Sequence, residues 1–292
     1  MSTLSSNAKG YILTLSCPNR PGIVAALSQT LYEAGANITE AQQYDDVGSG
    51  SFFMRIMFDI VKGKTTEAEV RVLVDAMAGE FGMDYRLNCQ SYRPKVVIMV
   101  SKFDHCLVDL LYRWRIGELP IEPVGIIANH TEETYKDIDF YGIPFHYLPI
   151  TKDTKAEQEA RILAVVEESG ADLVVLARYM QILSNDMAAA LSGRCINIHH
   201  SFLPGFKGAR PYHQAYERGV KLIGATAHYV TRDLDEGPII EQDVERISHA
   251  DSPDDLIRKG RDIERRVLAR AVRYHIEMRT IMNGNKTIVF VS

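Results

Sequence analysis

The segment Ser91-Tyr92-Arg93-Pro94-Lys95-Val96-Val97-Ile98-Met99-Val100 (residues 91–100) decides how this chain of 292 residues is organised. Its first half is polar and contains a proline, which interrupts regular structure, whereas residues 96–100 form an unbroken apolar run. Such a run is typical of a parallel strand that is buried on both faces of its sheet. The segment therefore predicts two domains, 1–90 and 91–292, the second of which begins with a buried strand.

Predicted strands and helices alternate along the second domain. The expected strands span residues 123–128, 145–150, 172–177 and 195–199, and the expected helices span residues 106–114 and 156–168. This alternation predicts an open, mostly parallel, Rossmann-like α/β sheet with helices on both faces. Ser252-Pro253-Asp254-Asp255 has the capping residue, the proline and the acids of a helix start, and Asn283-Gly284 indicates a hairpin turn.

The first domain has the pattern of a compact α+β unit. Strands are expected at residues 11–16, 37–44, 52–60 and 83–90, with helices beginning at Ile23 and spanning residues 67–81. Gly35 stands where a helix end favours a left-handed residue, and residues 45–50 form a hairpin turn. The order βαββαβ predicts a ferredoxin-like fold.

Composition and charge restrict the classes of function. The net charge is -5 and no run of lysine and arginine occurs, which argues against a nucleic-acid-binding surface. No stretch approaches the ~20 apolar residues that cross a bilayer, which argues against a membrane protein. Cys17, Cys89, Cys106 and Cys195 have no paired spacing, so we expect free thiols in a reducing compartment. A cytoplasmic protein is the resulting expectation.

The chemistry is concentrated in the stretch that begins Cys195-Ile196-Asn197-Ile198-His199. Alternate residues of a strand point to the same face, so Asn197 and His199 are expected to project together while the residue between them points into the core. Pro204-Gly205 then turns the chain, which places the pair at a strand end. With Asp235, they supply an amide donor, an imidazole and a carboxylate, the groups needed to attack a carbonyl carbon and hold the resulting oxyanion.

Nearby residues have more than one interpretation. Strand alternation points His200 away from His199, which favours a structural or supporting role, and His228 fits the active-site wall as well as the core. A metal site is not favoured, because the histidines lack the H-E-x-x-H spacing. A serine nucleophile is not favoured either, because Gly48-Ser49-Gly50-Ser51 does not match a G-x-S-x-G elbow.

Residues 95–282 resemble the formyltransferase family that uses 10-formyltetrahydrofolate. The resemblance rests on four segments in a fixed order: Met180-Gln181-Ile182-Leu183-Ser184, Ile196-Asn197-Ile198-His199-His200-Ser201-Phe202-Leu203-Pro204, Gly224-Ala225-Thr226-Ala227-His228 and Leu234-Asp235-Glu236-Gly237-Pro238-Ile239-Ile240. Four widely spaced segments are far more specific than any single short motif.

The first domain resembles the ACT domain, a unit that senses small molecules. The matching residues are Pro18-Asn19-Arg20-Pro21-Gly22-Ile23-Val24 and Gly35-Ala36-Asn37-Ile38. An ACT domain joined to a formyltransferase-like domain is the arrangement of the formyltetrahydrofolate deformylase family. The resemblance implies a homo-oligomer with an amino-acid effector, methionine or glycine, whose carboxylate lies at a helix N-terminus near Asn19, Arg20 and Gly22. The alternative is a domain that serves oligomerisation alone.

Carried over by position, the resemblance to the formyltransferases implies that Asn197, His199 and Asp235 are catalytic. It also implies that the backbone of the folate segment, residues 178–183, meets the polar edge of the pterin and that the loop 231–237 closes over the pterin. The expected substrate-binding residues are Arg178, Met180, Gln181, Ile182, Leu183, Thr231 and Gly237. Lys207 and Arg210 either approach the glutamate tail of the folate or remain solvated.

Departures from the formyltransferase pattern indicate which molecule accepts the formyl group. Where glycinamide ribonucleotide transformylases carry a Gly-rich phosphate loop, this chain has Ser101-Lys102-Phe103-Asp104-His105, with no glycine to let a phosphate approach. Nor does it carry the basic RNA-binding domain of the methionyl-tRNA formyltransferases. Water is the acceptor that remains.

We therefore expect hydrolysis of 10-formyltetrahydrofolate to formate and tetrahydrofolate, without a cofactor or metal. This reaction would balance one-carbon pools and supply formate for purine synthesis. The alternative is a formyltransferase with an unrecognised acceptor, which would need an acceptor pocket near residues 102–105. A non-catalytic folate or amino-acid sensor has no use for three catalytic residues.

Overall fold

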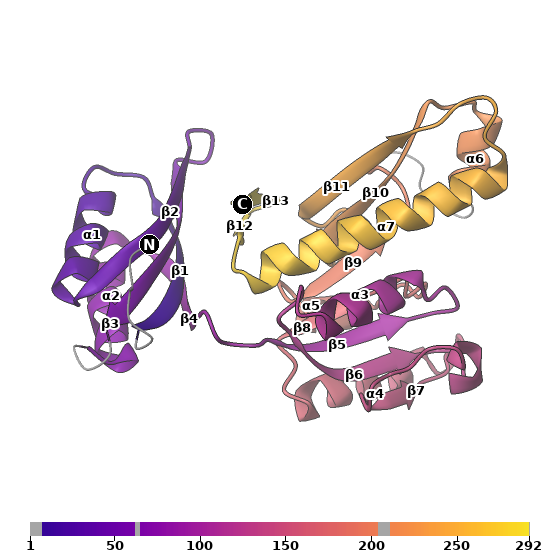
Figure 1. Cartoon of the computed structure of the whole chain (residues 1–292), viewed down its shortest axis with the longest axis horizontal. Helices are drawn as coiled ribbons and strands as arrows, with labels where there is room; N and C mark the ends of the chain where they lie inside the picture. The colour runs from indigo at the N-terminus through magenta and orange to yellow at the C-terminus, as the bar shows by residue number, and fades with distance from the viewer. Residues whose placement is uncertain (1–7, 62–64, 204–210, 292) are drawn as a thin grey trace. The chain divides into compact units, whose positions relative to one another are not determined.

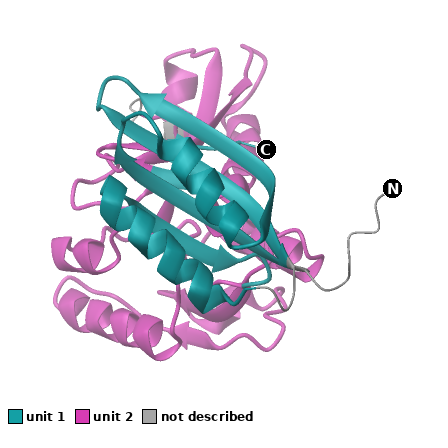
Figure 2. Ribbon diagram, turned by 90° about the vertical axis from the view of Figure 1, so that its left-hand side faces the viewer, with its two compact units in different colours: residues 1–92, 278–281, 288–292 teal, residues 93–277, 282–287 magenta. Residues whose placement is uncertain are grey.

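A computed structural model of the chain describes residues 8–61, 65–203 and 211–291, which form two compact units (Figures 1 and 2). The first unit consists of residues 1–92, 278–281 and 288–292, and the second of residues 93–277 and 282–287. Two short C-terminal segments thus belong to the first unit. In the part of the chain that is described, no helix is long and apolar enough to cross a membrane.

The first unit contains a four-stranded antiparallel sheet and two helices (Figure 2). Its elements are β1 (Ala8–Pro18), α1 (Ile23–Glu33), β2 (Ala36–Asp46), β3 (Ser51–Val61), α2 (Glu67–Phe81) and β4 (Asp84–Cys89). The strand order is β2-β3-β1-β4. This order and the βαββαβ connectivity confirm the predicted ferredoxin-like fold.

The two helices of the first unit begin and end where local chemistry favours it. α1 buries Ile23, Leu27 and Leu31, one residue per turn on the face toward the sheet. The chain leaves it through Gly35 at φ 69°, a left-handed conformation that glycine adopts without strain. α2 begins with a capping box in which the side chains of Thr66 and Glu69 each accept a backbone N–H, an arrangement that typically contributes ~1 kcal/mol.

The second unit is built around a seven-stranded sheet (Figure 1). Its elements up to β9 are β5 (Lys95–Val100), α3 (His105–Arg115), β6 (Glu122–Ala128), η1 (Glu132–Tyr135), β7 (Phe145–Tyr147), α4 (Lys155–Glu168), β8 (Leu173–Leu176), α5 (Asn185–Ala190) and β9 (Cys195–His199). They are followed by α6 (Pro211–Glu217), β10 (Leu222–Tyr229), β11 (Ile239–Arg246) and α7 (Pro253–Ile276). The last strands, β12 (Thr280–Asn283) and β13 (Lys286–Val289), pair in a separate two-stranded sheet and are divided between the two units.

The strand order of this sheet is β11-β10-β9-β8-β5-β6-β7. The strands from β9 to β7 are parallel, whereas β10 is antiparallel to both of its neighbours. The predicted open, mostly parallel sheet is confirmed. The structure adds two strands to the predicted ones, β10 and β11, and β7 ends at Tyr147 rather than at residue 150.

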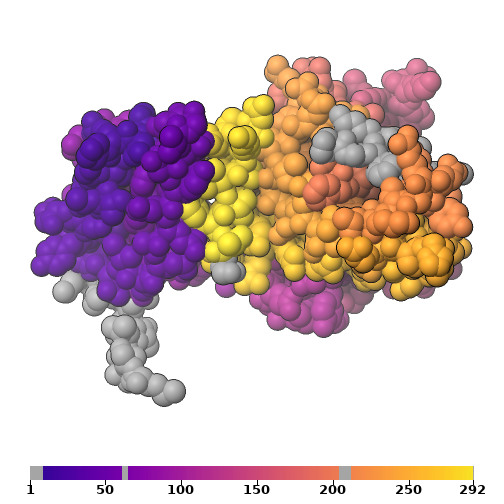
Figure 3. Space-filling view, turned by 90° about the horizontal axis from the view of Figure 1, so that it is seen from above, coloured from indigo at the N-terminus to yellow at the C-terminus, as the bar shows by residue number. Residues whose placement is uncertain are grey.

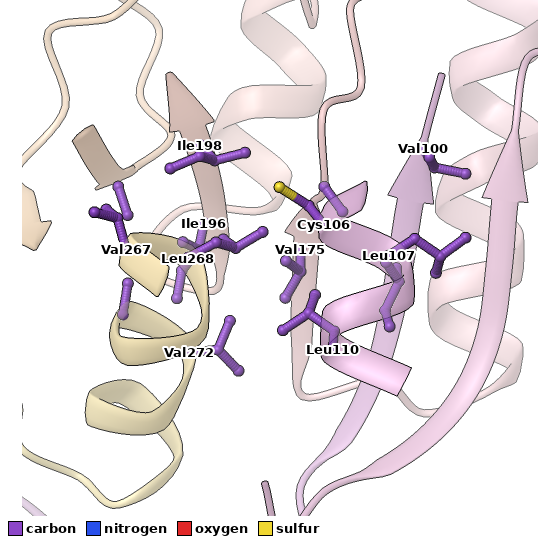
Figure 4. Close-up of a cluster of buried hydrophobic side chains, with 14 of the residues drawn as sticks. Val100, Cys106, Leu107, Leu110, Val175, Ile196, Ile198, Val267, Leu268 and Val272 are labelled. Atoms are coloured by element: carbon purple, nitrogen blue, oxygen red, sulfur yellow. The ribbon is translucent and has the colours of Figure 1, made fainter. Parts of the chain in front are cut away.

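β5 lies in the middle of the parallel part and is buried on both faces. Val96, Ile98 and Val100 belong to a core cluster with α3 and α7, whereas Val97 and Met99 pack in a second cluster with α4 and α5. Figure 4 shows part of the first cluster, including side chains of α3 and α7. Each fully buried aliphatic side chain stabilises the fold by about 1.5–3 kcal/mol.

The C-terminal elements follow most of the predicted signals. α7 begins at the predicted residue, because Ser252 and Asp255 form a capping box and Pro253 occupies the first turn. It lies along β10 and β11 (Figures 1 and 3). The predicted hairpin is present, but its turn is Gly284-Asn285, one position later than predicted, since Asn283 still belongs to β12. All four cysteines are free thiols.

Candidate active site

A cavity of about 780 Å³ opens beyond the carboxyl ends of β5, β8 and β9, the usual position of a ligand site in a parallel sheet. It brings together most of the residues that the sequence predicts for substrate binding and catalysis. The predicted residues that line it are Arg178, Met180, Gln181, Ile182, Leu183, Asn197, His199, Thr231 and Asp235.

Gly237 lies beside this lining rather than in it. A Cβ at this position would lie 1.7 Å from the carbonyl oxygen of Tyr229, so only glycine lets the two backbone segments pass in contact. Lys207 and Arg210, with the turn Pro204-Gly205, lie outside the described residues.

His199 and Asp235 form the charged centre of the cavity. The imidazole Nδ1 lies 3.2 Å from Oδ1 of Asp235, and the side chains are 10% and 15% exposed. Burial disfavours the carboxylate, but the hydrogen bond from His199 and the surrounding imidazoles outweigh burial and lower the pKa of Asp235. Asp235 is therefore ionised at neutral pH, and as a charged acceptor it orients an N–H of His199 at Nδ1.

The other ring nitrogen of His199 is left for reactants. Nε2 is buried and makes no hydrogen bond with any described residue. The backbone of Asp235 has φ 57°, a left-handed conformation that aspartate and asparagine adopt more readily than other non-glycine residues. In this conformation the side chain of Asp235 faces His199.

The orientation of Asn197 follows from the pairing of β9 with β10. Asn197 lies directly opposite His228 in the antiparallel register, and its Nδ2 is 3.2 Å from His228 Nε2. His228 Nδ1 is 2.9 Å from the carbonyl oxygen of Tyr229, which can only accept, so Nδ1 carries the proton. Burial lowers the pKa of His228, so the ring is neutral and Nε2 accepts an N–H from Asn197. His228 therefore belongs to the site, and the second N–H of Asn197 remains available.

Buried hydroxyl groups hold the loops around the cavity in place. Ser101 Oγ accepts the backbone N–H of Met180 at 3.0 Å and donates to Asn129 at 2.8 Å. Thr226, which is fully buried, donates to the carbonyl of Ser201 and accepts the N–H of Leu203, each at 3.0 Å. These bonds fix the start of the predicted folate segment and the chain directly after β9. Neither hydroxyl was predicted, because each acts through a long-range contact.

His200 faces the cavity, contrary to the prediction from strand alternation. β9 ends at His199, so the alternation does not extend to the next residue. The His200 ring stacks on that of His199, with centroids 5.2 Å apart and planes inclined by 23°. Burial, together with the charge of Arg178, lowers the pKa of His200 to about 4. His200 is therefore an uncharged residue in the wall of the site at physiological pH.

Replacing His200 with phenylalanine is expected to make the second unit less sensitive to acid. The pKa of His200 is about 4 when folded and 6.5 ordinarily, so the unfolded chain binds its proton first as the pH falls. Its contribution to stability is complete above about pH 6.5 and is lost toward pH 4, a loss of about 2 kcal/mol at about pH 5. Urea unfolding followed by the fluorescence of the single tryptophan, Trp114, measures this difference between about pH 7.5 and pH 5.

The matched control is His249→Phe, which removes an exposed imidazole. The control is expected to retain the acid sensitivity of the wild-type protein. An equal loss of stability in His200→Phe and in the wild type would show that His200 does not titrate in this way.

A second group of polar and charged residues, most of them buried, lies at the end of the cavity next to α7. Glu264 is 1% exposed, and its Oε1 accepts the hydroxyl of Tyr212 at 2.6 Å. Its Oε2 lies 2.8 Å from Nε2 of His105 and 3.2 Å from Nε of Arg178. Burial disfavours the Glu264 carboxylate, but the hydrogen bond from His105 and the Arg178 charge outweigh it and lower its pKa. The sequence did not predict this group, whose members come from four separate segments.

One set of possible metal ligands occurs within residues 8–61, 65–203 and 211–291. Donor atoms of His105, Cys106 and Glu264 lie within 4.8 Å of one another. Burial, followed by the Glu264 charge, raises the pKa of the Cys106 thiol well above its ordinary value, so the thiol is protonated and a poor ligand. The guanidinium of Arg178 already neutralises Glu264. The donor set therefore fits a metal ion poorly.

The predicted effector residues lie at the start of α1 in the first unit. Gly22 caps the helix at φ 96°, and no side chain hydrogen-bonds to the cap. The backbone N–H of Asn19 donates to Gly50, 2.8 Å away. Arg20 donates to the carbonyl of Glu80 at 2.8 Å, and its guanidinium lies 4.0 Å from the ring centroid of Phe81. Arg20 is thus engaged within its own unit, while the helix start has no side-chain acceptor.

Comparison with known proteins identifies relatives over almost the whole chain. Residues 94–272 match the model of the formyl transferase family, and residues 11–75 match that of the ACT domain. Formyltetrahydrofolate deformylase of Bacillus subtilis (strain 168) is 51% identical over 283 residues, which cover 97% of this chain and 94% of that protein. The protein of the same name from Corynebacterium sp. (strain P-1) is 50% identical over 279 residues, 96% of this chain and 97% of the relative.

Solved structures are similar to this chain in the same way. The crystal structure of formyltetrahydrofolate deformylase from Burkholderia mallei ATCC 23344 has a TM-score of 0.91 and 51% identity, and covers 97% of this chain and all of that one. Glycinamide ribonucleotide transformylase 1 from Symbiobacterium toebii has a TM-score of 0.63 and 28% identity, over 70% of this chain and 98% of its own.

Proposed function

The chain belongs to the formyltetrahydrofolate deformylase family and is a hydrolase of 10-formyltetrahydrofolate; from its site geometry we propose which residues carry out the reaction. The reaction releases formate and tetrahydrofolate. The observation that carries the assignment of roles is the His199–Asp235 pair beside the amide of Asn197, at the ends of the parallel strands. We propose that the reaction balances one-carbon pools and supplies formate for purine synthesis.

His199 acts first as a base and then as an acid. With Nδ1–H bound to Asp235, the lone pair of Nε2 takes a proton from water as the water oxygen attacks the formyl carbon. Asp235 stabilises the imidazolium that forms. As the bond from the formyl carbon to N10 breaks, His199 returns the proton to N10, and the product leaves as formic acid, which ionises in solution. One residue thus serves both half-reactions, and the protons balance.

Asn197 stabilises the tetrahedral intermediate. Its amide is fixed by the N–H donated to His228, so the remaining N–H points at one place without further ordering. A pre-positioned donor of this kind stabilises charge that appears only in the transition state. Neutral His228 sets the direction of the amide, which makes it a positioning residue.

The folate body occupies the loops beside this centre. Met180 and Ile182 are 49% and 60% exposed at the cavity, and Leu183 lines it with them. An apolar wall with a few fixed polar groups suits the pterin and benzoate rings. Gln181 and Thr231 supply side-chain polar groups to the same lining. For Arg178 we propose a contribution through the backbone, since its side chain is directed to Glu264.

No cofactor takes part in this scheme, because water and three side chains supply the nucleophile, the proton and the oxyanion donor. Formate release from 10-formyltetrahydrofolate, in the presence of a chelator and with no added acceptor, tests it. Steady release over many turnovers is the expected result. Binding of the folate without formate, or a loss of activity that zinc restores, would contradict it.

We propose that the first unit binds an amino-acid effector, methionine or glycine, and mediates a homo-oligomer. The uncapped start of α1 supports a carboxylate site, because free N–H groups and the helix dipole favour an anion. Four free cysteines support a reducing compartment, the cytoplasm.

Methionine or glycine is expected to raise the melting temperature of the full-length protein by roughly 3 °C at ten times its dissociation constant, equivalent to about 1.4 kcal/mol. Methionine amide, which lacks the carboxylate, is the matched control and is expected to give no shift. Equal shifts with the acid and the amide would contradict a carboxylate site at α1. No shift with any amino acid would leave oligomerisation as the role of this unit.

A further inference from the structure

One end of the cavity is lined by side chains that the proposed mechanism does not use. We call them the arginine cluster, which consists of Phe103, His105, Arg178, Tyr212 and Glu264, all of which line the cavity. The cluster adjoins the catalytic centre through His200. The ring centroids of His199 and His200 are 5.2 Å apart, and those of His200 and Tyr212 are 6.3 Å apart.

The Glu264 carboxylate at the centre of the cluster is engaged at both oxygens. Oε1 accepts the hydroxyl of Tyr212, and Oε2 lies against His105 and forms an ion pair with Arg178. The face of Phe103 lies 5.9 Å from the guanidinium of Arg178. An amine acceptor would need hydrogen-bond acceptors here for its N–H groups, and the carboxylate that could supply them is paired with the guanidinium of Arg178.

Arg178 occupies its place under constraint. Its backbone has φ 64°, its side chain is 9% exposed, and neither Nε nor Nη1, both buried, makes a hydrogen bond with any described residue. Tyr212, which holds the far side of Glu264, packs so closely on α7 that a Cβ at Gly260 would lie 2.2 Å from the tyrosine hydroxyl. A strained residue with an unpaired buried donor is an unfavourable way to stabilise a core, which points to a role in function.

We propose that Arg178, held by Glu264, closes the acceptor side of the cavity and thereby restricts formyl transfer to water. This role rests on the proposed hydrolysis and explains why water, rather than an amine, accepts the formyl group. Transfer to an amine would form a bond from its nitrogen to the formyl carbon, break the bond to N10, and move one proton from the amine to N10. Water needs neither the volume nor the anchoring groups that an amine acceptor needs, and the guanidinium repels an ammonium. Arg178 is in this sense a specificity-determining residue.

The test is the partition of the formyl group between water and hydroxylamine. Tetrahydrofolate reports total turnover, and formylhydroxamic acid, measured as its iron(III) complex, reports transfer to the amine. Arg178→Gly keeps the positive φ without strain and removes the guanidinium. The fraction of turnovers that yield formylhydroxamic acid is expected to rise at least tenfold in Arg178→Gly, and about threefold in Phe103→Ala, which opens the same end and keeps the ion pair.

Arg258→Ala is the matched control. It removes an exposed guanidinium from α7 that pairs with Asp255 and does not line the cavity, so the partition is expected to stay as in the wild type. An unchanged partition in an active Arg178→Gly enzyme would overturn the proposal, as would a wild-type enzyme that already transfers readily to hydroxylamine. If Arg178→Gly does not fold or turn over, Phe103→Ala decides, and an unchanged partition there overturns it. Formate release without hydroxylamine tests the proposed hydrolysis separately.

Discussion

Replacing Asp235 with asparagine is expected to lower kcat for formate release by about 10³–10⁴-fold, the loss typical of exchanging the carboxylate that orients a catalytic imidazole for an amide. The amide has no charge to stabilise the imidazolium form of His199. It can also present an N–H to Nδ1, which would move the proton of His199 to Nε2 and remove the base. Asparagine adopts a φ of 57° readily, so the loop keeps its conformation and the effect reports chemistry.

The comparison for this variant is Asp153→Asn, which makes the same chemical change at an exposed position that does not line the cavity. We expect the control to keep turnover within about threefold of the wild type. Tetrahydrofolate binding, measured by calorimetry, is expected to be similar in both variants, since the carboxylate of Asp235 acts on His199. An Asp235→Asn enzyme that retains a tenth of wild-type turnover would exclude the proposed role.

The elements of the fold follow from local patterns, whereas their neighbours in the sheet do not. The apolar run 96–100 predicts a doubly buried strand because both of its faces must meet helices, and β5 has that environment. Residues 222–229 and 239–246 mix small, polar and apolar residues. They lack the strict alternation of polar and apolar residues that predicts a strand. They become strands because β9 offers an edge on which β10 pairs.

The same distinction between local patterns and long-range contacts explains which residues of the site can be predicted. Asn197 and His199 share one strand, so alternation predicts that they project together, and both line the cavity. The alternation does not apply to His200, because the strand ends one residue before it. The ends of strands are the least certain part of a prediction from sequence. His228 reaches Asn197 only through the register of two strands, and Glu264 meets Arg178 only through the docking of α7. Contacts of this kind have no signature within a short window of sequence.

The amide of Asn197 has the second large expected effect. Asn197→Ala is expected to lower kcat by about 10²–10³-fold, the usual loss when one donor to an oxyanion is removed. The dissociation constant for tetrahydrofolate is expected to change by less than about threefold, because the free N–H meets an oxygen that carries negative charge only in the transition state. Single-turnover kinetics separate the two quantities. A fall in turnover of less than threefold would exclude the assigned role.

Asn197→Asp distinguishes the donor from the shape of the side chain. Aspartate has the size of asparagine, but it puts an oxygen where the N–H faces the intermediate and removes the N–H donated to neutral His228. It is therefore expected to be at least as slow as the alanine variant, since a negative charge near the oxyanion adds repulsion to the lost bond. Protonation of His228 would offset part of that repulsion, so the loss of kcat is expected to become smaller as the pH is lowered. An aspartate variant with wild-type turnover would show that Asn197 only fills space.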